Sequence, residues 1–534
     1  MRDSETSSVH SSSENESDEE DKEAETMFEE ACRDLDSVVK ITNVVERFAA
    51  AKQKSKVVRF IQRQLSKVKS NAKYSSNSQQ IVNSIQNTKQ LIGQERIKDA
   101  INNCNWIIRH VEDPYGGESR ETIFEVLTMR ANLFRSGEYY MKEVKDKLYS
   151  YQYFGAHSSW LRRWKSVSES LGKGNEDNPF LSFSDDMAQH DEYFDSSNDF
   201  YSDAMILQEQ EGQGRFVVAG KDIEQKTELI REKAYAVEIE PEFILKVCSR
   251  CLTPLHDQHY PCPRCPKVAF CSPRCAFIGW RSHRYVCGFI DVQPEVTLGT
   301  NCIARIGIEK AIQLYSRYLN GERYNIFDLQ PTTNEEDRFM AFLSLYDGDD
   351  VLRDIVKATR IVYACLNHTI VEQKGFMKSL SEDEKNKFGA LLVKIFETAI
   401  INAFTVYEKI TELKYPKPSA EFDFSRGEDD IATAFVIKSS LFNHNCNENT
   451  SWHITSNGIQ TFRTRQKIKQ GNQITINYGY SKLKNNWPER QEGLWETYRF
   501  KCACRMCESE KEQYRGNPKY EHLFEQTWES NFLE

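Results

Sequence analysis

The chain has 534 residues, of which 39% are hydrophobic and 12% aromatic, and its formal net charge is −10. This length leaves room for two to four domains, and the composition excludes a wholly disordered protein. The apolar runs fall short of the roughly 18 residues that a membrane helix needs, so we expect no membrane partner. The first 25 residues contain no apolar stretch of the signal-peptide kind, and we expect the protein in the nucleus and the cytoplasm.

The N-terminal third predicts a tail followed by helices. Residues 1–25 are rich in Ser and acids, which predicts disorder. Residues 26–170 space their apolar residues as helices do. Two amphipathic halves around the Gly-Glu-Tyr turn at 137–139 resemble a tetratricopeptide (TPR) repeat, and an ordinary helical hairpin is the alternative. The acid-rich range 171–205 predicts a linker.

The remaining chain alternates β-like, Cys-rich and helical segments. Strand-like patterns occupy two separate ranges, and a helical pattern and two Cys-rich ranges lie around them. The predicted segments are 206–247 (β-like), 248–287 (Cys-rich), 288–430 (helical), 431–485 (β-like), 486–510 (Cys-rich) and 511–534 (a C-terminal tail). We therefore predict an α+β multidomain protein preceded by an all-α region.

The first Cys-rich segment predicts two structural zinc sites. Zinc prefers four Cys or His ligands in a tetrahedron, and eight candidate ligands within 40 residues would close two such sites without an open position for catalysis. Redox chemistry of the Cys-x-x-Cys pairs is the alternative, but the βαβ context of such motifs is missing from the pattern. The candidate ligands are Cys248, Cys251, Cys262, Cys265, Cys271, Cys275, His283 and Cys287.

The second Cys-rich segment supplies only three ligands, Cys502, Cys504 and Cys507. Three ligands do not close a tetrahedral site. We predict that Cys446, in the unusually polar stretch "FNHNCNENTSWHI", is the fourth ligand and ties this stretch to the tail. The sequence thus predicts three Zn²⁺ ions in all.

The motifs of this chain resemble those of two known domain families, each in a different part of the chain. The first cluster, with Trp280 and the His283-x-x-x-Cys287 ending, resembles a MYND zinc finger. In that family the pairs interleave, which implies that Cys248 and Cys251 share one ion with Cys271 and Cys275, and that the other four ligands share the second ion.

The polar stretch "NHNCNEN" at 443–449 and "GNQITINYGY" at 471–480 resemble the SET domain of lysine methyltransferases. Residues 489–507, "ERQEGLWETYRFKCACRMC", resemble its post-SET segment. Asn445 and Glu448 depart from the Ser and Pro that are usual in the family motif.

A SET domain split by a MYND finger and a helical insert resembles the SET-and-MYND (SMYD) family. The helical region in front of it resembles the subgroup of the fourth member. The resemblance implies that 206–247 and 431–485 are the two parts of one β-rich SET domain.

The resemblance implies S-adenosylmethionine as the cofactor. Phe216 and Lys226 stand where many members have Gly, and Phe500 is expected to stack on the adenine. The implied cofactor-binding residues are Gln213, Gly214, Arg215, Tyr324, Asn402, Asn443, His444, Tyr478 and Phe500.

The resemblance also implies methyl transfer to lysine side chains of histone or non-histone proteins. Tyr478 and Tyr498 are the implied catalytic pair that lines the lysine channel, and the alternative is that both are ordinary core aromatics.

A different class of function is an adaptor or transcriptional regulator centred on the finger, with a weak or inactive SET domain. MYND fingers resemble docking modules for proline-rich peptides. Nucleic acid is a further possible partner, although the net charge argues against it. The basic residues that would touch it are Arg264, Lys267, Arg274, Arg281 and Arg284.

Overall fold

The computed structural model describes most of the chain, and the statements below concern only that part. The described residues are 22–71, 78–111, 117–136, 142–143, 145–147, 149–150, 199–210, 214–255, 259–262, 265, 267–289, 296–408, 429–455, 458–480 and 485–524. The predicted tail 1–25 and linker 171–205 lie largely outside these residues. Among the described helices, none is long and apolar enough to cross a membrane.

Strands from both sides of the Cys-rich segment pair with one another. The order β1–β4–β12–β11 forms one sheet and β5–β9–β8 another, while β2–β3 and β10–β13 form two-stranded sheets. Thus β4 and β5, before residue 248, pair with β12 and β9, after residue 428. The strands are β1 (Phe200–Tyr201), β2 (Met205–Gln210), β3 (Gly214–Ala219), β4 (Glu228–Lys233), β5 (Ala236–Ile239), β8 (Ala403–Glu408), β9 (Asp429–Phe435), β10 (Asn443–His444), β11 (Thr450–Ile454), β12 (Ile459–Thr464) and β13 (Thr475–Ile476).

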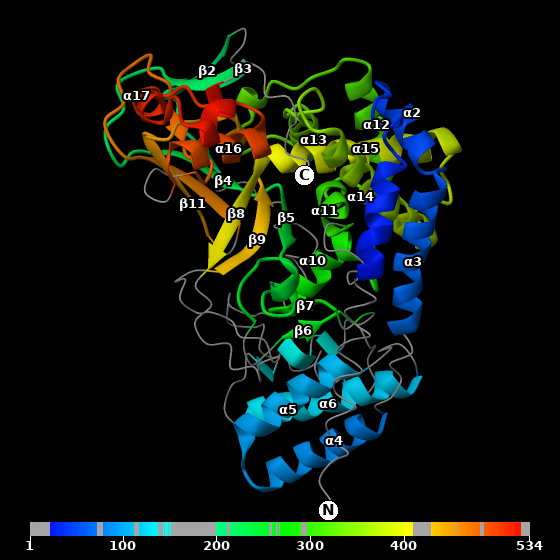
Figure 1. Ribbon diagram of the computed structural model, residues 1–534. Coiled ribbons are helices and arrows are strands. Elements are labelled where there is room, and N and C mark those ends of the chain that lie inside the picture. The colour runs from blue at the N-terminus through cyan, green and yellow to red at the C-terminus, as the bar shows by residue number, and fades with distance from the viewer. Residues whose placement is uncertain are drawn as a thin grey trace, which may run out of the picture.

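The Cys-rich segment and the helices lie beside these sheets (Figure 1). The Cys-rich segment contains the short strands β6 (Tyr260–Pro261) and β7 (Ala269–Phe270) and the helix α10 (Pro273–His283). The helices that follow are α11 (Val296–Ile303), α12 (Ile308–Leu319), α13 (Glu335–Leu343), α14 (Asp354–Gln373) and α15 (Glu382–Asn402). Ser381 and Glu384 form a capping box that starts α15, whose middle is buried.

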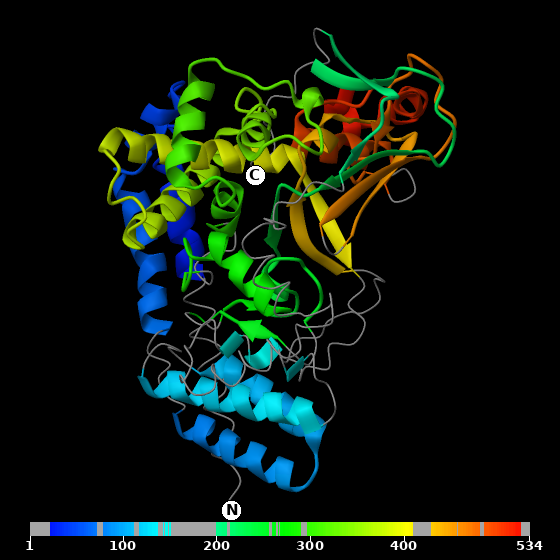
Figure 2. The ribbon, with the colours of Figure 1, turned by 180° about the vertical axis from the view of Figure 1, so that it is seen from behind.

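The N-terminal helices divide into two groups that contact different parts of the molecule (Figures 1 and 2). Helices α2 (Val44–Ala51) and α3 (Ser55–Asn71) lie along α14, and α2 also packs on α15. Helices α4 (Ser78–Gly93), α5 (Ile97–His110) and α6 (Gly117–Ser136) pack in that order, and α5 and α6 lie between α4 and the Cys-rich segment. The TPR-like assignment stays a prediction, because the turn at 137–139 lies outside the described residues.

The α2 contact is close-packed. The Phe48 ring fills the space beside Gly389, where a Cβ atom would collide with it, and its centroid lies 5.1 Å from that of the tilted His368 ring. Burial lowers the pKa of His368 to about 4, so this imidazole is neutral in the core at physiological pH. Helix α2 is therefore part of the same core as the helical segment that follows residue 288.

Two of the predicted segments contain a strand that the prediction did not place there. Strand β1 lies inside the predicted linker, because Phe200 and Tyr201 pair with β4. Strand β8 lies inside the predicted helical segment, and its Thr405 and Val406 are β-branched residues that suit a strand.

The described part of the predicted C-terminal tail, residues 511–524, also packs against the rest of the chain. Its short helix η7 (Pro518–Phe524) contacts α16 (Trp487–Tyr498), with the Phe524 and Trp487 rings 5.3 Å apart.

Glu397 is a buried acid within the α2 contact. Its side chain is 3% exposed, and its Oε1 lies 3.6 Å from Nη1 of Arg47 in α2. Burial and the nearby carboxylates of Asp349 and Asp347 raise its pKa to about 8, and the cations Arg47 and Lys394 oppose this rise. Glu397 is therefore protonated in the folded protein at neutral pH.

This predicts that stability falls as pH rises toward 8. Below pH 4.5 the carboxyl is protonated in both states. Above that, the unfolded state ionises while the folded state cannot, so the free energy of unfolding falls by about 1.4 kcal/mol per pH unit until about pH 8. We expect the melting temperature of Glu397→Gln to depend less on pH than that of the wild type between pH 5.5 and 8.5. Glu372→Gln, at an exposed carboxyl of α14, is the control, and equal slopes for wild type and Glu397→Gln would contradict the prediction.

Candidate functional site

The four cysteines expected to close the third metal site lie together. The sulfurs of Cys446, Cys502, Cys504 and Cys507 are all within 4.8 Å of one another. Cys446 Sγ lies 3.5 Å from that of Cys507 and 3.8 Å from that of Cys502. Four thiols at this spacing fit one tetrahedral zinc ion. The polar loop and the C-terminal tail therefore meet at this cluster.

Two side chains of α16 support this cluster. Arg490, 1% exposed, directs Nη2 to Cys507 Sγ at 3.7 Å and to Glu510 Oε2 at 2.6 Å, so a cation faces the thiols. Gln491 accepts from the N–H of Cys502 and donates to its carbonyl oxygen, both at 3.0 Å. These contacts hold the tail beside the cluster, and the guanidinium would offset the charge of thiolates.

The finger cysteines form two interleaved groups. Cys248, Cys251, Cys271 and Cys275 form one group, and Cys262, Cys265, His283 and Cys287 form the other, each with its ligand atoms within 4.8 Å of one another. These are the two sets that the MYND resemblance implies. Helix α10 carries a ligand of each group, because Cys275 lies in its first turn and His283 at its end. Both donor sets fit structural zinc.

The polar loop is anchored at its start by a buried carboxylate. Glu232 in β4 accepts hydrogen bonds from the backbone N–H groups of Ile437, Lys438 and Ser439 at 2.9–3.0 Å and from the Ser439 hydroxyl at 2.7 Å. These donors belong to the first turn of the short helix η5 (Lys438–Leu441), where backbone N–H groups have no helical partner. The charged acceptor thus determines where η5, and the loop after it, begins.

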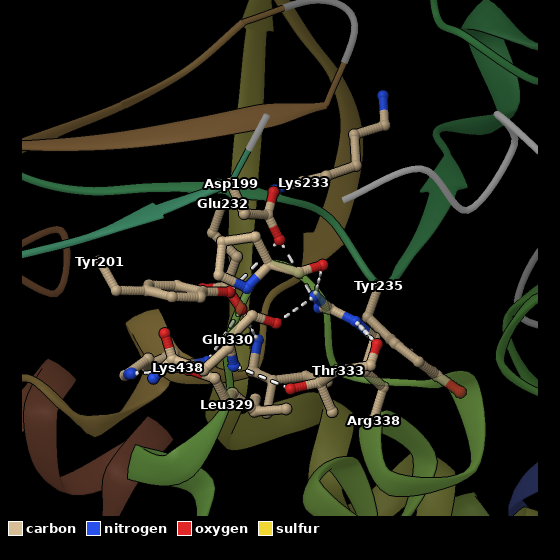
Figure 3. Close-up of polar contacts among 12 residues, drawn as sticks. Asp199, Tyr201, Glu232, Lys233, Tyr235, Leu329, Gln330, Thr333, Arg338 and Lys438 are labelled. Atoms are coloured by element: carbon tan, nitrogen blue, oxygen red, sulfur yellow. Dashed lines mark hydrogen bonds and ion pairs between the residues drawn. The ribbon is translucent and has the colours of Figure 1, made fainter. Parts of the chain in front are cut away.

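Further charges surround Glu232 (Figure 3). Lys438 Nζ donates to the carbonyl oxygens of Phe327 and Leu329, and burial lowers its pKa to about 8. Asp199 lies 3.5 Å from Arg338, and burial beside Glu232 raises its pKa to about 7. The network joins β1, β4, η5 and the segment before α13, so the loop start is held from several sides.

His444 is bound within the chain through both ring nitrogens. Its Nδ1 accepts from the backbone N–H of Tyr478 at 3.1 Å, so the neutral ring carries its proton on Nε2, which lies 3.2 Å from Cys446 Sγ. The family resemblance implied a cofactor contact for Asn443 and His444. The structure leaves the backbone and ring face of His444 for such a contact. Strand β10, which contains both residues, pairs in parallel with β13.

Four rings gather next to this loop. Tyr478 lies 4.7 Å from Tyr498, 5.3 Å from His444 and 6.3 Å from Phe500, measured between ring centroids. Arg499, at φ +58°, ends α16 in the left-handed region and turns the chain between Tyr498 and Phe500. This turn brings both tail aromatics to the same group as Tyr478.

The two tyrosines are neutral phenols. Burial raises the pKa of Tyr478 well above its usual value, and burial with Tyr480 raises that of Tyr498 to about 12. The Tyr478 hydroxyl donates to the carbonyl oxygen of Phe442 at 2.7 Å. Its hydrogen is thus used within the chain, and its oxygen is left as an acceptor.

The other predicted cofactor residues meet at the loop between α13 and α14. Arg215 donates from Nη2 to the Ser344 carbonyl at 3.1 Å, the N–H of Tyr324 donates to Ser344 Oγ at 3.0 Å, and Asn402 Nδ2 donates to the Tyr346 carbonyl at 2.8 Å. Asn402 Nδ2 also donates to the Thr398 carbonyl, so Oδ1 is the side-chain atom left for a ligand that donates.

The start of β3 has an unusual backbone conformation. Gly214 has φ +65°, and a Cβ atom there would meet no atom within 4 Å, so the backbone conformation is what requires Gly. Gln213 lies outside the described residues. Phe216 is buried in the core, and Lys226 takes φ +66° at the turn where relatives favour Gly.

Comparison with known proteins agrees with this geometry. Residues 214–479 match the SET domain family model. A SET and MYND domain-containing protein of Dictyostelium discoideum is 25% identical over 55% of this chain and 58% of its own length. The protein-lysine N-methyltransferases SMYD4 of Homo sapiens and Mus musculus are 31% and 34% identical over 21% and 38% of this chain.

The chain belongs to the SET-and-MYND (SMYD) family. It spans 58% of the length of this Dictyostelium protein, and 14% and 24% of the human and mouse SMYD4 proteins.

Several residues that hold the SMYD site were missed by sequence reasoning. Glu232, Ser344 and Gln491 act through contacts with backbone groups, which leave no motif in the sequence. In β4 (Glu228–Lys233) charged residues outnumber apolar ones, so Glu232 did not stand out in the sequence.

The tail cluster predicts separable effects of metal loss. We expect metal analysis of the purified protein to give three zinc ions per chain, and two in Cys504→Ser. Because Tyr498 and Phe500 lie on the segment that this cluster holds, S-adenosylmethionine affinity in Cys504→Ser should fall by about tenfold or more.

Cys251→Ser is the matched control, since it removes a half-buried ligand from the finger instead. It should also retain two ions but keep the wild-type affinity within about twofold. Full cofactor affinity in Cys504→Ser would contradict the prediction.

Proposed function

We propose that this chain is an S-adenosylmethionine-dependent protein-lysine N-methyltransferase. The observation that carries the proposal is the ring group of His444, Tyr478, Tyr498 and Phe500, with the Tyr478 hydroxyl held by the Phe442 carbonyl. The match to the SET domain model and the names of the SMYD4 relatives support it.

The residues around the rings fit the cofactor. Asn402 Oδ1 is an acceptor suited to an ammonium group, and the Arg215 guanidinium, whose pKa burial lowers, suits a carboxylate. Phe500 offers a flat apolar face for adenine, and Gly214 lets a ligand approach the backbone. S-adenosylmethionine would supply a methyl group on a sulfonium, ready for direct displacement by an amine.

The residues of the chain would have two tasks in this reaction. The first is to present the lysine as a neutral amine, which needs its pKa lowered from about 10.4 to near 7.4, equivalent to about 4 kcal/mol. Desolvation beside the rings of Tyr478 and Tyr498 acts in this direction. Neither phenol acts as the base, because burial raises both pKa values above the usual range. The proton would therefore leave to solvent before the amine enters.

The second task is alignment. With its hydrogen committed to Phe442, the Tyr478 oxygen can accept a hydrogen from the amine or from the polarised methyl group. Its backbone N–H is also fixed on His444, so the ring is held at both ends. Alignment of this kind contributes several kcal/mol to such displacements.

The finer assignments are part of this proposal. We propose three structural zinc ions, and a SET domain interrupted by the finger and the helical segment; the pairing of β4 with β12 and of β5 with β9 supports the second assignment. The substrate class is proteins with accessible lysines, histone or non-histone. Membership in the fourth-member subgroup is supported by the SMYD4 matches.

The test is transfer of labelled methyl groups to proteins in a cell extract. Tyr478→Phe removes only the hydroxyl, so its S-adenosylmethionine affinity should stay within about twofold while turnover falls by about tenfold or more. Tyr480→Phe is the matched control, because that hydroxyl contacts Thr497 Oγ1 at 3.1 Å, and it should keep its turnover. Equal turnover in wild type and Tyr478→Phe would remove this hydroxyl from the mechanism.

An adaptor function remains a second candidate, because the finger already contacts another segment of the same chain. Arg130 of α6 donates to the His259 carbonyl at 3.2 Å, and the Tyr149 hydroxyl donates to the Pro261 carbonyl. The Tyr149 and Tyr260 rings lie 4.9 Å apart. These contacts lie at the β6 edge of the finger, so a peptide that binds there has to displace the helices.

This predicts that exposing the edge increases peptide binding. In Tyr149→Ala the ring and the hydrogen bond are both lost, and we expect the full chain to bind a labelled proline-rich peptide about tenfold more tightly in fluorescence anisotropy. Tyr514→Ala, at a ring stacked on Trp487 far from the finger in sequence, is the control. Equal binding by wild type and Tyr149→Ala would show that the helices do not compete with such peptides.

A further inference from the structure

One short loop holds three of the residues assigned to the cofactor. The α13–α14 loop, defined here as Ser344–Asp349, accepts hydrogen bonds from Arg215 and Tyr324 at Ser344 and from Asn402 at Tyr346. These residues come from β3, from the segment after α12 and from the end of α15. Because separate elements converge on one loop, a shift of this loop would displace that side of the site as a unit.

The loop is itself held by charges. Lys394 Nζ donates to the Leu345 carbonyl at 3.1 Å and to Asp347 Oδ2 at 2.5 Å. The Asp349 N–H donates to Asp347 Oδ1 at 3.2 Å. Gly348 has φ +72° and sits where a Cβ atom would collide with Ile401, so the loop is tightly packed on the end of α15.

An arginine from the N-terminal helices completes this arrangement. Arg47 in α2 donates from Nη1 and Nη2 to the two oxygens of Asp349, at 2.7 and 3.1 Å, across 302 residues of sequence. Its Nε donates to the Ile41 carbonyl at 2.7 Å, and its side chain is only 3% exposed. The guanidinium is buried while the Asp349 side chain is 40% exposed, and a two-pronged guanidinium–carboxylate pair is both strong and specific in direction.

The other cation near Asp349 cannot replace it. Lys357 Nζ lies 3.3 Å from Asp349 Oδ1, but a single ammonium does not reproduce the fork, and Lys357 belongs to α14 rather than to α2. Loss of Arg47 would therefore free Asp349 from α2 and leave Glu397 without its nearest cation.

We propose that Arg47 is a positioning residue for the cofactor site, which it orders by clamping the α13–α14 loop to helix α2. The N-terminal helices thereby contribute to cofactor affinity without touching the cofactor. This inference rests on the proposed function for its effect on binding, and on geometry alone for its effect on the loop.

The test compares full-length Arg47→Gln with wild type in two measurements. Hydrogen exchange without cofactor should be about tenfold faster in the Ser344–Asp349 amides of the variant. Calorimetric S-adenosylmethionine affinity should fall by about tenfold, and in turnover assays the KM for the cofactor should rise while kcat at saturation is kept.

Two further variants make the result specific. Lys52→Gln removes an ion pair between the end of α2 and Glu382 in α15, far along α15 from the loop, and should change neither measurement. Asp349→Asn removes the acceptor charge from the partly exposed side and should reproduce Arg47→Gln. In the double variant the two effects should not add. If Arg47→Gln fails to fold, Asp349→Asn carries the test.

The outcomes separate the two proposals. Unchanged loop exchange and affinity in Arg47→Gln and Asp349→Asn would overturn the clamp. Folded, zinc-loaded wild type that does not bind S-adenosylmethionine would overturn the proposed function, while faster loop exchange in the variants would still support the clamp as a structural device.

Discussion

The geometry of the site depends first on Glu232. This carboxylate is 1% exposed and receives four hydrogen bonds from residues 437–439, more than 200 positions later in the chain. Each bond to a charged acceptor contributes about 1.5–3 kcal/mol, and without them the buried carboxylate would be strongly destabilising. The two halves of the β-rich domain are thus joined by an interaction that is favourable only when all its donors are in place. This contact therefore also fixes where the loop after η5 begins.

The other end of the loop is fixed by Cys446, and His444 links that end to the reacting region. In an extended chain, residues two apart point to the same side, which brings the His444 ring to Cys446. The other ring nitrogen accepts from the Tyr478 N–H, so it must be unprotonated for this contact. A polar path of three contacts therefore runs from the cysteine cluster through His444 and Tyr478 to the Phe442 carbonyl. The unusual density of polar residues in this stretch has its physical explanation here.

Sequence reasoning succeeded where chemistry is encoded by local spacing. The Cys-x-x-Cys pairs and the three tail cysteines, which lacked a fourth ligand, predicted the metal groups and the partner Cys446. The resemblance to the MYND finger supplied the interleaving, and the structure brings all these residues together. Sequence reasoning failed for contacts between residues far apart in the chain and for contacts made to backbone acceptors. The Ser344 carbonyl binds Arg215 from 129 residues away, and such contacts impose no period on the sequence.

Amino-acid composition also gave a wrong prediction at the C-terminal end of the linker. The acidic run ending near Asp203 predicts a solvated linker, but Asp199 is packed against Arg338 and caps the Lys233 N–H. An acid with a buried partner behaves as part of the core, and charge counting along the sequence does not distinguish it from a solvated one. The predicted location in the nucleus and cytoplasm, by contrast, depends on no feature of the fold and stays a prediction.

The residues assigned to the candidate site form two groups, called walls here, with different sources of stability. Tyr498 and Phe500 belong to the tail that the cysteine cluster holds, so this wall would depend on the proposed zinc ion. Arg215, Tyr324 and Asn402 belong to the wall held by the α13–α14 loop, which depends on buried charge pairs and on helix α2. Metal loss and loss of the α2 contact should therefore loosen different walls of the proposed site. Since a cofactor that spans both walls would bind each only when the other is in place, either source alone would be insufficient, and cofactor binding would in turn couple the N-terminal helices to the C-terminal tail.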